Sequence, residues 1–232
     1  MNPDLSPAPP FAAIVFDMDG VVIDSEPIHD RSHRIIFGLH DLPVPAEAYP
    51  SFKGIPERKL FERVVSEFGS DEHDVDTLTV SKEETFLSLM PDMRPIPGVL
   101  DFIRLAKSQM RLALTTSATS RYQRFAFDRF DLDRFFEVVV TAEDIHRHKP
   151  DPEPYQETAK RLGLAPEMCF VIEDSVNGVR SAYRAGCHVA GITTSFSAGE
   201  LEEAGAHIVI DTFEELAERL GMGKNGAART AD

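Results

Sequence analysis

The sequence predicts an α/β protein in which a doubly wound parallel sheet, covered by helices, carries a small α-helical domain inserted after its first strand. Six short runs rich in Val, Ile, Leu and Ala alternate with helical patterns along the 232-residue chain. Runs this apolar suit strands that are buried on both faces, as in a parallel sheet. Nearly a hundred residues without another strand-like run separate the first run from the second, and they mark the insertion.

The six predicted strands cover residues 12–17, 111–116, 137–141, 169–174, 188–193 and 207–211. Helical patterns fill intervals at residues 98–109, 154–163, 178–186 and 213–221. Gly163, Gly186 and Gly221 each stand where one of these helices should end, because glycine readily adopts the conformation of a helix C-cap. The alternation therefore predicts a parallel sheet covered by helices.

The inserted segment has a helical pattern. In residues 57–69 one apolar stripe is formed by Leu60, Phe61, Val64, Val65 and Phe68. Prolines at positions 91, 95 and 97 mark the return to the sheet. We therefore expect a core of residues 11–24 and 95–221, a helical domain of residues 25–94, and disordered tails at residues 1–10 and 222–232.

Composition excludes several partner classes. The chain has 24 basic and 39 acidic residues and a net charge of −15, so it repels nucleic-acid backbones and anionic lipid. Its apolar runs are far shorter than the ~20 residues of a membrane-spanning helix, and its N-terminus does not resemble a signal peptide. Cys169 and Cys187 lie in or beside apolar runs and are predicted to be buried free thiols. We expect a cytoplasmic protein that binds neither nucleic acid nor membrane.

Polar residues follow the predicted strands at the ends where ligands bind in open α/β sheets. Asp17 and Asp19 follow the first strand, and residues two apart in an extended segment point the same way. The second strand ends in the hydroxyl groups of Thr115, Thr116 and Ser117. The ammonium group of Lys149, among prolines, comes after the third strand, and the fourth strand ends in the carboxylates of Glu173 and Asp174. These groups are expected to face one ligand.

These carboxylate, hydroxyl and ammonium groups fit the chemistry of phosphoryl transfer. A phosphate dianion repels an attacking carboxylate, so a hard cation must hold the two together. Mg²⁺ prefers oxygen ligands, which Asp17 and Asp174 can help to provide. Lys149 and the Thr116 hydroxyl can stabilise charge on the transferring oxygens. A carboxylate nucleophile gives an aspartyl-phosphate that water later opens, and a second carboxylic acid nearby can protonate the leaving alcohol.

Four segments resemble, in order, the motifs of the haloacid dehalogenase superfamily. DMDGVVIDSE at residues 17–26 resembles the first motif, Thr116 in LALTTSA the second, Lys149 in HKPDPEPY the third, and VIEDSVNGVRSAYRAG at residues 171–186 the fourth. The resemblance spans residues 11–221 and is to the β-phosphoglucomutase-like branch. It implies a Rossmann-like core with a mobile helical cap that closes over the substrate.

The resemblance also implies a role for each motif residue. Asp17 would be the nucleophile, and Asp19 the general acid and then the general base. Mg²⁺ would be held by Asp17, by the main-chain carbonyl of Asp19 and by Asp174, with Glu173 as a further acidic contact. The phosphoryl group would be bound by Thr116, Ser117 and Lys149.

Further candidates belong to the cap. His29 lies ten residues after Asp19, where the branch often places a histidine that faces the acid–base residue. Lys53-Gly54 resembles the cap loop that meets the substrate. The cap-side set is completed by Ser25 and Arg58. His148 replaces the small residue that commonly precedes the motif lysine. His146 and His148 do not predict a transition-metal site, because no third ligand stands at a suitable spacing.

Two reactions fit these residues. One is hydrolysis of small phosphorylated metabolites such as sugar phosphates, and the other is a β-phosphoglucomutase-like sugar phosphomutase. A mutase needs a cap cation, usually arginine, for the non-reacting phosphate, and here Glu57 stands at that position with Arg58 one step later. A carboxylate there would repel a second phosphate, and one step along a helix turns a side chain by about 100°. The sequence therefore favours the phosphatase.

Two other functions are disfavoured. A dehalogenase would not need Asp19, because halide leaves unprotonated. A non-enzymatic phospho-acceptor signalling domain would be about half this length and would lack the insert. The expected partner is a small phosphorylated substrate; the sequence indicates neither its identity nor the oligomeric state, and a monomer is compatible with it.

Overall fold

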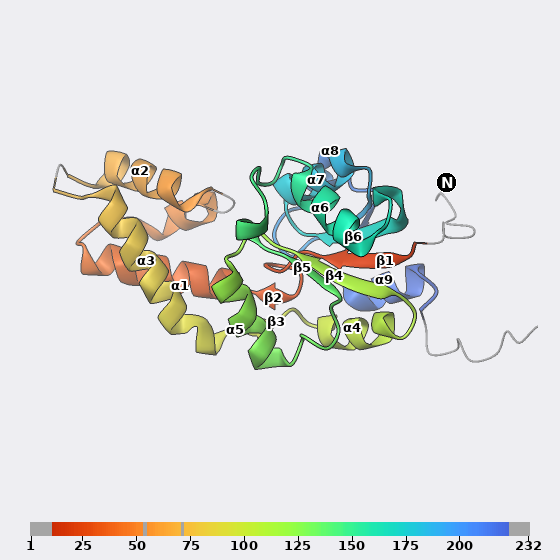
Figure 1. The fold of residues 1–232 in the computed structure, drawn as a ribbon. Helices are drawn as coiled ribbons and strands as arrows, with labels where there is room; N and C mark the ends of the chain where they lie inside the picture. The colour runs from red at the N-terminus through yellow and green to blue at the C-terminus, as the bar shows by residue number, and fades with distance from the viewer. Residues whose placement is uncertain (1–10, 53–54, 71, 223–232) are drawn as a thin grey trace, which may run out of the picture. The chain divides into compact units, whose positions relative to one another are not determined.

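The computed structural model describes residues 11–52, 55–70 and 72–222 (Figure 1). The chain divides into two compact units. The core unit combines Met1–Asp24 with Pro95–Asp232, and the helical unit is Ser25–Arg94.

The core unit is built on a six-stranded sheet with the order β5-β4-β1-β6-β7-β8, and every strand pair is parallel. The strands are β1 Ala13–Phe16, β4 Arg111–Thr115, β5 Val138–Val140, β6 Cys169–Glu173, β7 His188–Ile192 and β8 Ile208–Ile210. Each predicted apolar run contains one strand, so the predicted α/β class is confirmed. In the central strand, Phe16 pairs with Leu114 on one side and Ile172 on the other, which aligns the carboxyl ends of β4, β1 and β6.

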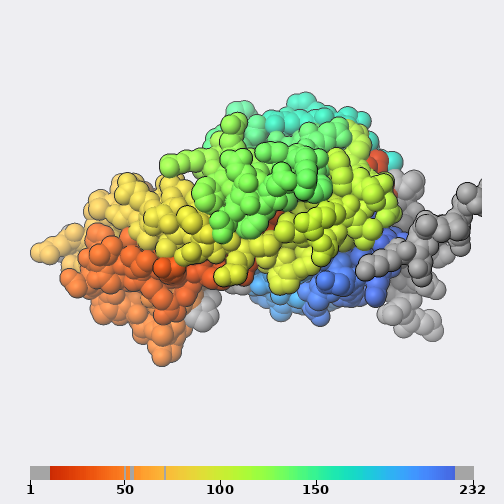
Figure 2. Space-filling view, turned by 90° about the horizontal axis from the view of Figure 1, so that it is seen from below, coloured from red at the N-terminus to blue at the C-terminus, as the bar shows by residue number. Residues whose placement is uncertain are grey.

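Helices cover both faces of this sheet. In Figure 1, one face carries α6 Glu153–Leu162, α7 Val176–Ala185 and α8 Ala198–Ala204, and the other carries α4 Val99–Lys107, α5 Ser120–Phe130 and α9 Phe213–Arg219. Figure 2 shows the second face, where segments of α4, α5 and α9 form the surface. The predicted end glycines Gly163 and Gly186 adopt left-handed φ values of 67° and 92°.

Two core helices were not predicted. α8 has only seven residues, and α5 interleaves its apolar side chains with three arginines and one aspartate, so neither has a long apolar stripe. Met222, which the sequence places at the start of the tail, is 2% exposed. Cys169 and Cys187 are buried free thiols in the cluster between the sheet and α6 and α7.

The helical unit has its own apolar core. It contains α1 Glu26–Leu39, the 3₁₀ helix η1 Ala46–Phe52, α2 Glu57–Phe68 and α3 Val75–Leu89. Of the predicted stripe on α2, Leu60, Phe61 and Val64 are buried, whereas Val65 and Phe68 are half-buried against the same cluster. The short strands β2 Ile23–Asp24 and β3 Arg94–Pro95 form a two-stranded sheet where the chain passes between the units. Among the described residues, no helix is long and apolar enough to cross a membrane.

Candidate active site

The carboxyl ends of the three central strands bring the motif residues together. Asp17 directly follows β1, and its backbone N–H donates to the Ile172 carbonyl of β6 at 3.0 Å. Glu173 ends β6, and Asp174 comes next. Parallel strands end at one edge of the sheet, so side chains separated by more than 150 residues in the sequence meet there.

Lys149 joins two of these carboxylates. Its Nζ donates to Asp17 Oδ1 at 2.5 Å, to Glu173 Oε1 at 2.7 Å and to the Thr115 carbonyl at 3.2 Å. Burial alone would lower the pKa of Lys149, but the charges of Asp17 and Glu173 outweigh burial and raise it above its ordinary value. The lysine is therefore a fixed positive charge beside Asp17.

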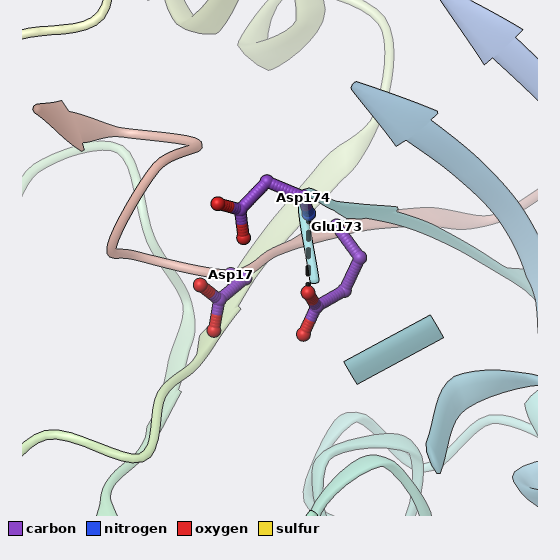
Figure 3. A group of neighbouring side chains, drawn as sticks. All are labelled: Asp17, Glu173 and Asp174. Atoms are coloured by element: carbon purple, nitrogen blue, oxygen red, sulfur yellow. Dashed lines mark hydrogen bonds between the residues drawn. The ribbon is translucent and has the colours of Figure 1, made fainter. Parts of the chain in front are cut away.

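Three buried carboxylates lie close together at this edge of the sheet. Asp17, Glu173 and Asp174 each offer an oxygen that lies within 4.8 Å of the other two (Figure 3). Burial raises the pKa of Asp17 to about 8 and the pKa of Asp174 well above its ordinary value, and the neighbouring carboxylates add to both shifts. One ammonium group does not balance three carboxylates in a buried site, so this donor set suits a hard divalent cation such as Mg²⁺.

Glu173 is held differently from its neighbours. Its Oε1 accepts from Lys149 and from the Tyr155 hydroxyl at 2.7 Å, while its Oε2 accepts from the backbone N–H groups of Asp174 and Ser175 and from the Ser175 hydroxyl. Both oxygens are thus engaged by the protein. Glu173 therefore anchors Lys149 and the start of α7, whereas Asp17 and Asp174 could hold a metal ion.

The turn after β1 requires a glycine. Gly20 has a φ of 76°, and a Cβ at this position would overlap the Asp174 carboxylate. The Gly20 N–H donates to the Ile23 carbonyl at 2.7 Å, which closes the turn that carries Asp19. A side chain at position 20 would therefore displace Asp174.

Asp19 has a partner that sequence reasoning missed. The Tyr122 hydroxyl of α5 donates to Asp19 Oδ1 at 2.7 Å, although the two residues are 103 positions apart. Tyr122 is 7% exposed, and Asp19 is half-buried. Tyr155 was missed for the same reason. Both are aromatic residues whose apolar bodies look like core positions, and no local pattern reveals what a hydroxyl contacts.

The hydroxyl candidates follow β4. Thr116 is buried, its N–H donates to the Val140 carbonyl, and its Oγ1 accepts from the Ala118 N–H at 3.0 Å. Ser117 is exposed. The structure thus places Thr116 at the end of the strand next to Asp17, with Ser117 one residue further into solvent.

The cap-side candidates lie in the helical unit. Ser25 is buried and precedes α1, and Arg58 is exposed and forms ion pairs with Asp76 and Glu62. Lys53 and Gly54 lie outside the described residues.

His29 has a defined protonation state. Its Nδ1 lies 2.8 Å from the Nζ of Lys82, and an ammonium group can only donate, so Nδ1 accepts and the ring proton is on Nε2. Burial and the Lys82 charge lower the pKa of His29 to about 3, which keeps the ring neutral. The sequence did not predict the part played by Lys82.

Glu57 is also engaged, which corrects the expected role of its charge. Lys82, 4% exposed, donates to Glu57 Oε2 at 2.5 Å, and His33 Nε2 lies 2.6 Å from Glu57 Oε1. From the sequence, Glu57 was expected to be an isolated carboxylate that would repel a second phosphate. In the structure Lys82 neutralises the charge of Glu57 within the helical unit. Glu57 therefore exerts little net repulsion on a second phosphate, although position 57 still offers no cation to bind one.

The sequence and the structure of this chain resemble those of known phosphatases and of a β-phosphoglucomutase candidate. A family model for haloacid dehalogenase-like hydrolases matches residues 14–192. A phosphorylated carbohydrates phosphatase from Thermotoga maritima is 32% identical over 88% of this chain and 96% of its own length. Fructose-1-phosphate phosphatase YqaB from Escherichia coli is 28% identical over 76% and 93%. A crystal structure of a β-phosphoglucomutase candidate from Thermotoga maritima aligns with a TM-score of 0.78 at 30% identity, covering 90% of this chain and 98% of that one.

Proposed function

The chain belongs to the haloacid dehalogenase-like hydrolases, and we propose that it hydrolyses sugar-sized phosphate monoesters with Mg²⁺ and with the Asp17 carboxylate as nucleophile. It is a phosphoric monoester hydrolase. The observation that carries the mechanistic proposal is the position of Asp17, whose carboxylate accepts a hydrogen bond from Lys149 and lies within 4.8 Å of an oxygen of Asp174.

Asp17 and Asp174, with the main-chain carbonyl of Asp19, would hold the metal. Mg²⁺ supplies charge neutralisation, which lets a phosphate dianion approach a carboxylate. The excess of buried carboxylate over ammonium at this edge of the sheet supports this assignment.

In the first step an oxygen of Asp17 attacks the phosphorus, and the bond between phosphorus and the ester oxygen breaks. Asp19, as the acid, gives its proton to the departing alcohol. Lys149 and the Thr116 hydroxyl hold the transferring oxygens, and Lys149 also fixes the rotamer of Asp17 through Oδ1. The product is an aspartyl-phosphate on Asp17 and a free alcohol.

In the second step water attacks the phosphorus of the aspartyl-phosphate. Asp19, now the base, takes the proton of that water, and the bond between phosphorus and Asp17 breaks. Asp17 returns to the carboxylate form and inorganic phosphate leaves. One residue can serve both steps, since the leaving alcohol and the incoming water approach the phosphorus from the same side.

The relatives support the proposed substrate class. Those that resemble this chain over most of its length include a phosphatase of phosphorylated carbohydrates and a fructose-1-phosphate phosphatase. We propose that the helical unit, Ser25–Arg94, acts as a mobile cap that selects the substrate and excludes water.

The alternative is a sugar phosphomutase, which the resemblance to a β-phosphoglucomutase candidate keeps open. A mutase must hold a second phosphate. In the described part of the helical unit, Arg58 is paired with Asp76 and Glu62, and Lys82 is paired with Glu57. These pairings favour the phosphatase, because both of these cations already have a carboxylate partner.

The test is a panel of phosphorylated sugars assayed for phosphate release with Mg²⁺. We expect release by the wild type and none by Asp17→Asn, whose amide keeps the shape but is no nucleophile. Asp101→Asn, an exposed aspartate on α4, serves as the matched control and should retain activity. Release by Asp17→Asn at the wild-type rate, in protein free of wild-type contamination, would refute the assignment.

A further inference from the structure

Tyr122 places a buried hydroxyl on the carboxylate of Asp19. The residue is 7% exposed, and its OH donates to Asp19 Oδ1 at 2.7 Å. A buried phenol hydroxyl without a partner would cost free energy, so this position needs an acceptor, and Asp19 supplies one. Neither the relatives nor the sequence motifs assign this tyrosine a role.

The element that carries Tyr122 is well anchored. The Thr119 side chain caps α5 and accepts from the Tyr122 N–H at 3.4 Å. The Ser120 N–H donates to the Glu143 carboxylate at 3.0 Å, which ties the first turn of α5 to the segment after β5. The phenol therefore projects from a fixed backbone.

The backbone of Asp19 is fixed too, but its side chain has two rotatable bonds. The turn around Gly20 is closed by hydrogen bonds that involve Met18 and Ile23, which holds the main chain. A hydrogen bond from a rigid donor to one carboxylate oxygen restricts rotation of the whole group.

From this geometry we propose that Tyr122 is a positioning residue that holds the Asp19 carboxyl where it exchanges protons with the leaving alcohol and with water. The inference rests on the proposed acid–base role of Asp19. A misplacement of about 1 Å at a reacting group can lower a rate by about 100-fold, so one hydrogen bond to Asp19 can matter for turnover without contacting the substrate.

The test compares Tyr122→Phe with wild type on two probes, glucose 6-phosphate, whose alkoxide leaving group needs a proton, and p-nitrophenyl phosphate, whose phenolate barely does. We expect kcat for glucose 6-phosphate to fall by about 10-fold to 100-fold with KM nearly unchanged, because general acid catalysis contributes about 100-fold to 10,000-fold and a misplaced acid loses part of it. The kcat for p-nitrophenyl phosphate should fall much less. Tyr183→Phe, which removes the hydroxyl of a tyrosine 55% exposed on α7, should change neither.

Two further variants separate the inference from its premise. Asp19→Ala should lower kcat for glucose 6-phosphate far more than for p-nitrophenyl phosphate, and in that background Tyr122→Phe should cause no further loss. Equal losses on both probes in Tyr122→Phe, or losses that multiply in the double variant, would overturn the role of Tyr122 and leave the proposed function intact. Equal losses in Asp19→Ala itself would refute the acid role and the inference together.

Discussion

The ammonium group of Lys149 lies 2.5 Å from Oδ1 of Asp17, and the side chain of Lys149 is only 7% exposed. Glu173 secures it from the other side at 2.7 Å. This relationship gives the proposed nucleophile a fixed orientation and a permanent positive neighbour.

Lys149→Met should therefore reduce kcat by about 100-fold to 1,000-fold, the scale expected when one group that stabilises transition-state charge is removed. Lys149→Arg should not restore the rate, because the planar guanidinium cannot match three converging acceptors as an ammonium group does. Steady-state kinetics on one sugar monophosphate gives kcat for both variants. Wild-type kcat in Lys149→Met would contradict the role.

Gly20→Ala should abolish most activity without unfolding the core. A Cβ at this position overlaps the Asp174 carboxylate, and the left-handed φ of 76° strains any other residue. The displaced carboxylate should weaken Mg²⁺ binding, so a titration of activity against Mg²⁺ should show a higher half-saturating concentration. Gly163→Ala, also left-handed but with no neighbour within 4 Å, is the control for strain alone. Equal metal dependence in the two variants would contradict this account.

The metal proposal predicts a difference between cations. Mg²⁺ should activate the enzyme, and removing it with a chelator should stop turnover. Ca²⁺ should inhibit, because it takes more ligands and accepts bidentate carboxylates, so both oxygens of Asp17 can be occupied. Phosphate release in the presence of each ion measures this. Full activity in Ca²⁺ with Mg²⁺ removed would count against Asp17 as the nucleophile held by the metal.

The ion pair of Lys82 with Glu57 should make the helical unit sensitive to acid. Burial alone would raise the pKa of Glu57, but His33 and Lys82 outweigh burial and lower it to about 2 from an ordinary 4.5. A lowered pKa stabilises the fold above the unfolded value of about 4.5, and this stabilisation, about 3 kcal/mol, is lost as the pH falls toward 2. Glu57→Gln removes the titrating group.

The stability difference between wild type and Glu57→Gln should therefore shrink as the pH falls from 7 to 3. Urea unfolding followed by circular dichroism at several pH values gives this difference. Glu62→Gln, an exposed neighbour on α2, is the matched control and should show a small difference at every pH. A wild-type advantage over Glu57→Gln that does not change with pH would contradict the assignment.

The mutase alternative has its own discriminating assay. β-Glucose 1-phosphate with a trace of the corresponding bisphosphate is supplied, and glucose 6-phosphate and free phosphate are followed together. We expect free phosphate to dominate, since Arg58 and Lys82 are already paired with carboxylates. Glucose 6-phosphate forming much faster than free phosphate would establish the mutase.

The sheet and the convergence of three acidic residues at its edge could be predicted from the sequence for a physical reason. Strands buried on both faces need continuous apolar runs, and parallel strands bring their carboxyl ends to one edge, so Asp17, Glu173 and Asp174 had to converge. The hydroxyl of Tyr122 and the ammonium of Lys82 could not be predicted this way. Their partners lie 103 and 25 positions away, and such contacts depend on tertiary packing that periodicity does not encode.

Prediction from the sequence meets the same limit in the helical unit. Its apolar stripe on α2 was visible in the sequence, whereas the cluster of Glu57, His33, Lys82 and His29 has no repeating pattern. Glu57 was interpreted from its place in the chain alone, and only the structure shows the cation that neutralises it. Polar networks inside a helical bundle are specified by geometry across helices rather than along one.

The central claim is that Asp17 becomes phosphorylated during turnover, and it can be measured directly. Wild-type enzyme turning over a sugar monophosphate with Mg²⁺ is quenched in acid, digested at acid pH with pepsin, and examined by mass spectrometry for a peptide that contains Asp17. We predict that this peptide carries one phosphoryl group on Asp17, that base removes it, and that Asp17→Asn carries none. Turnover by the wild type with no phosphorylated peptide under any quench, or a phosphoryl group found on another residue, would contradict the account.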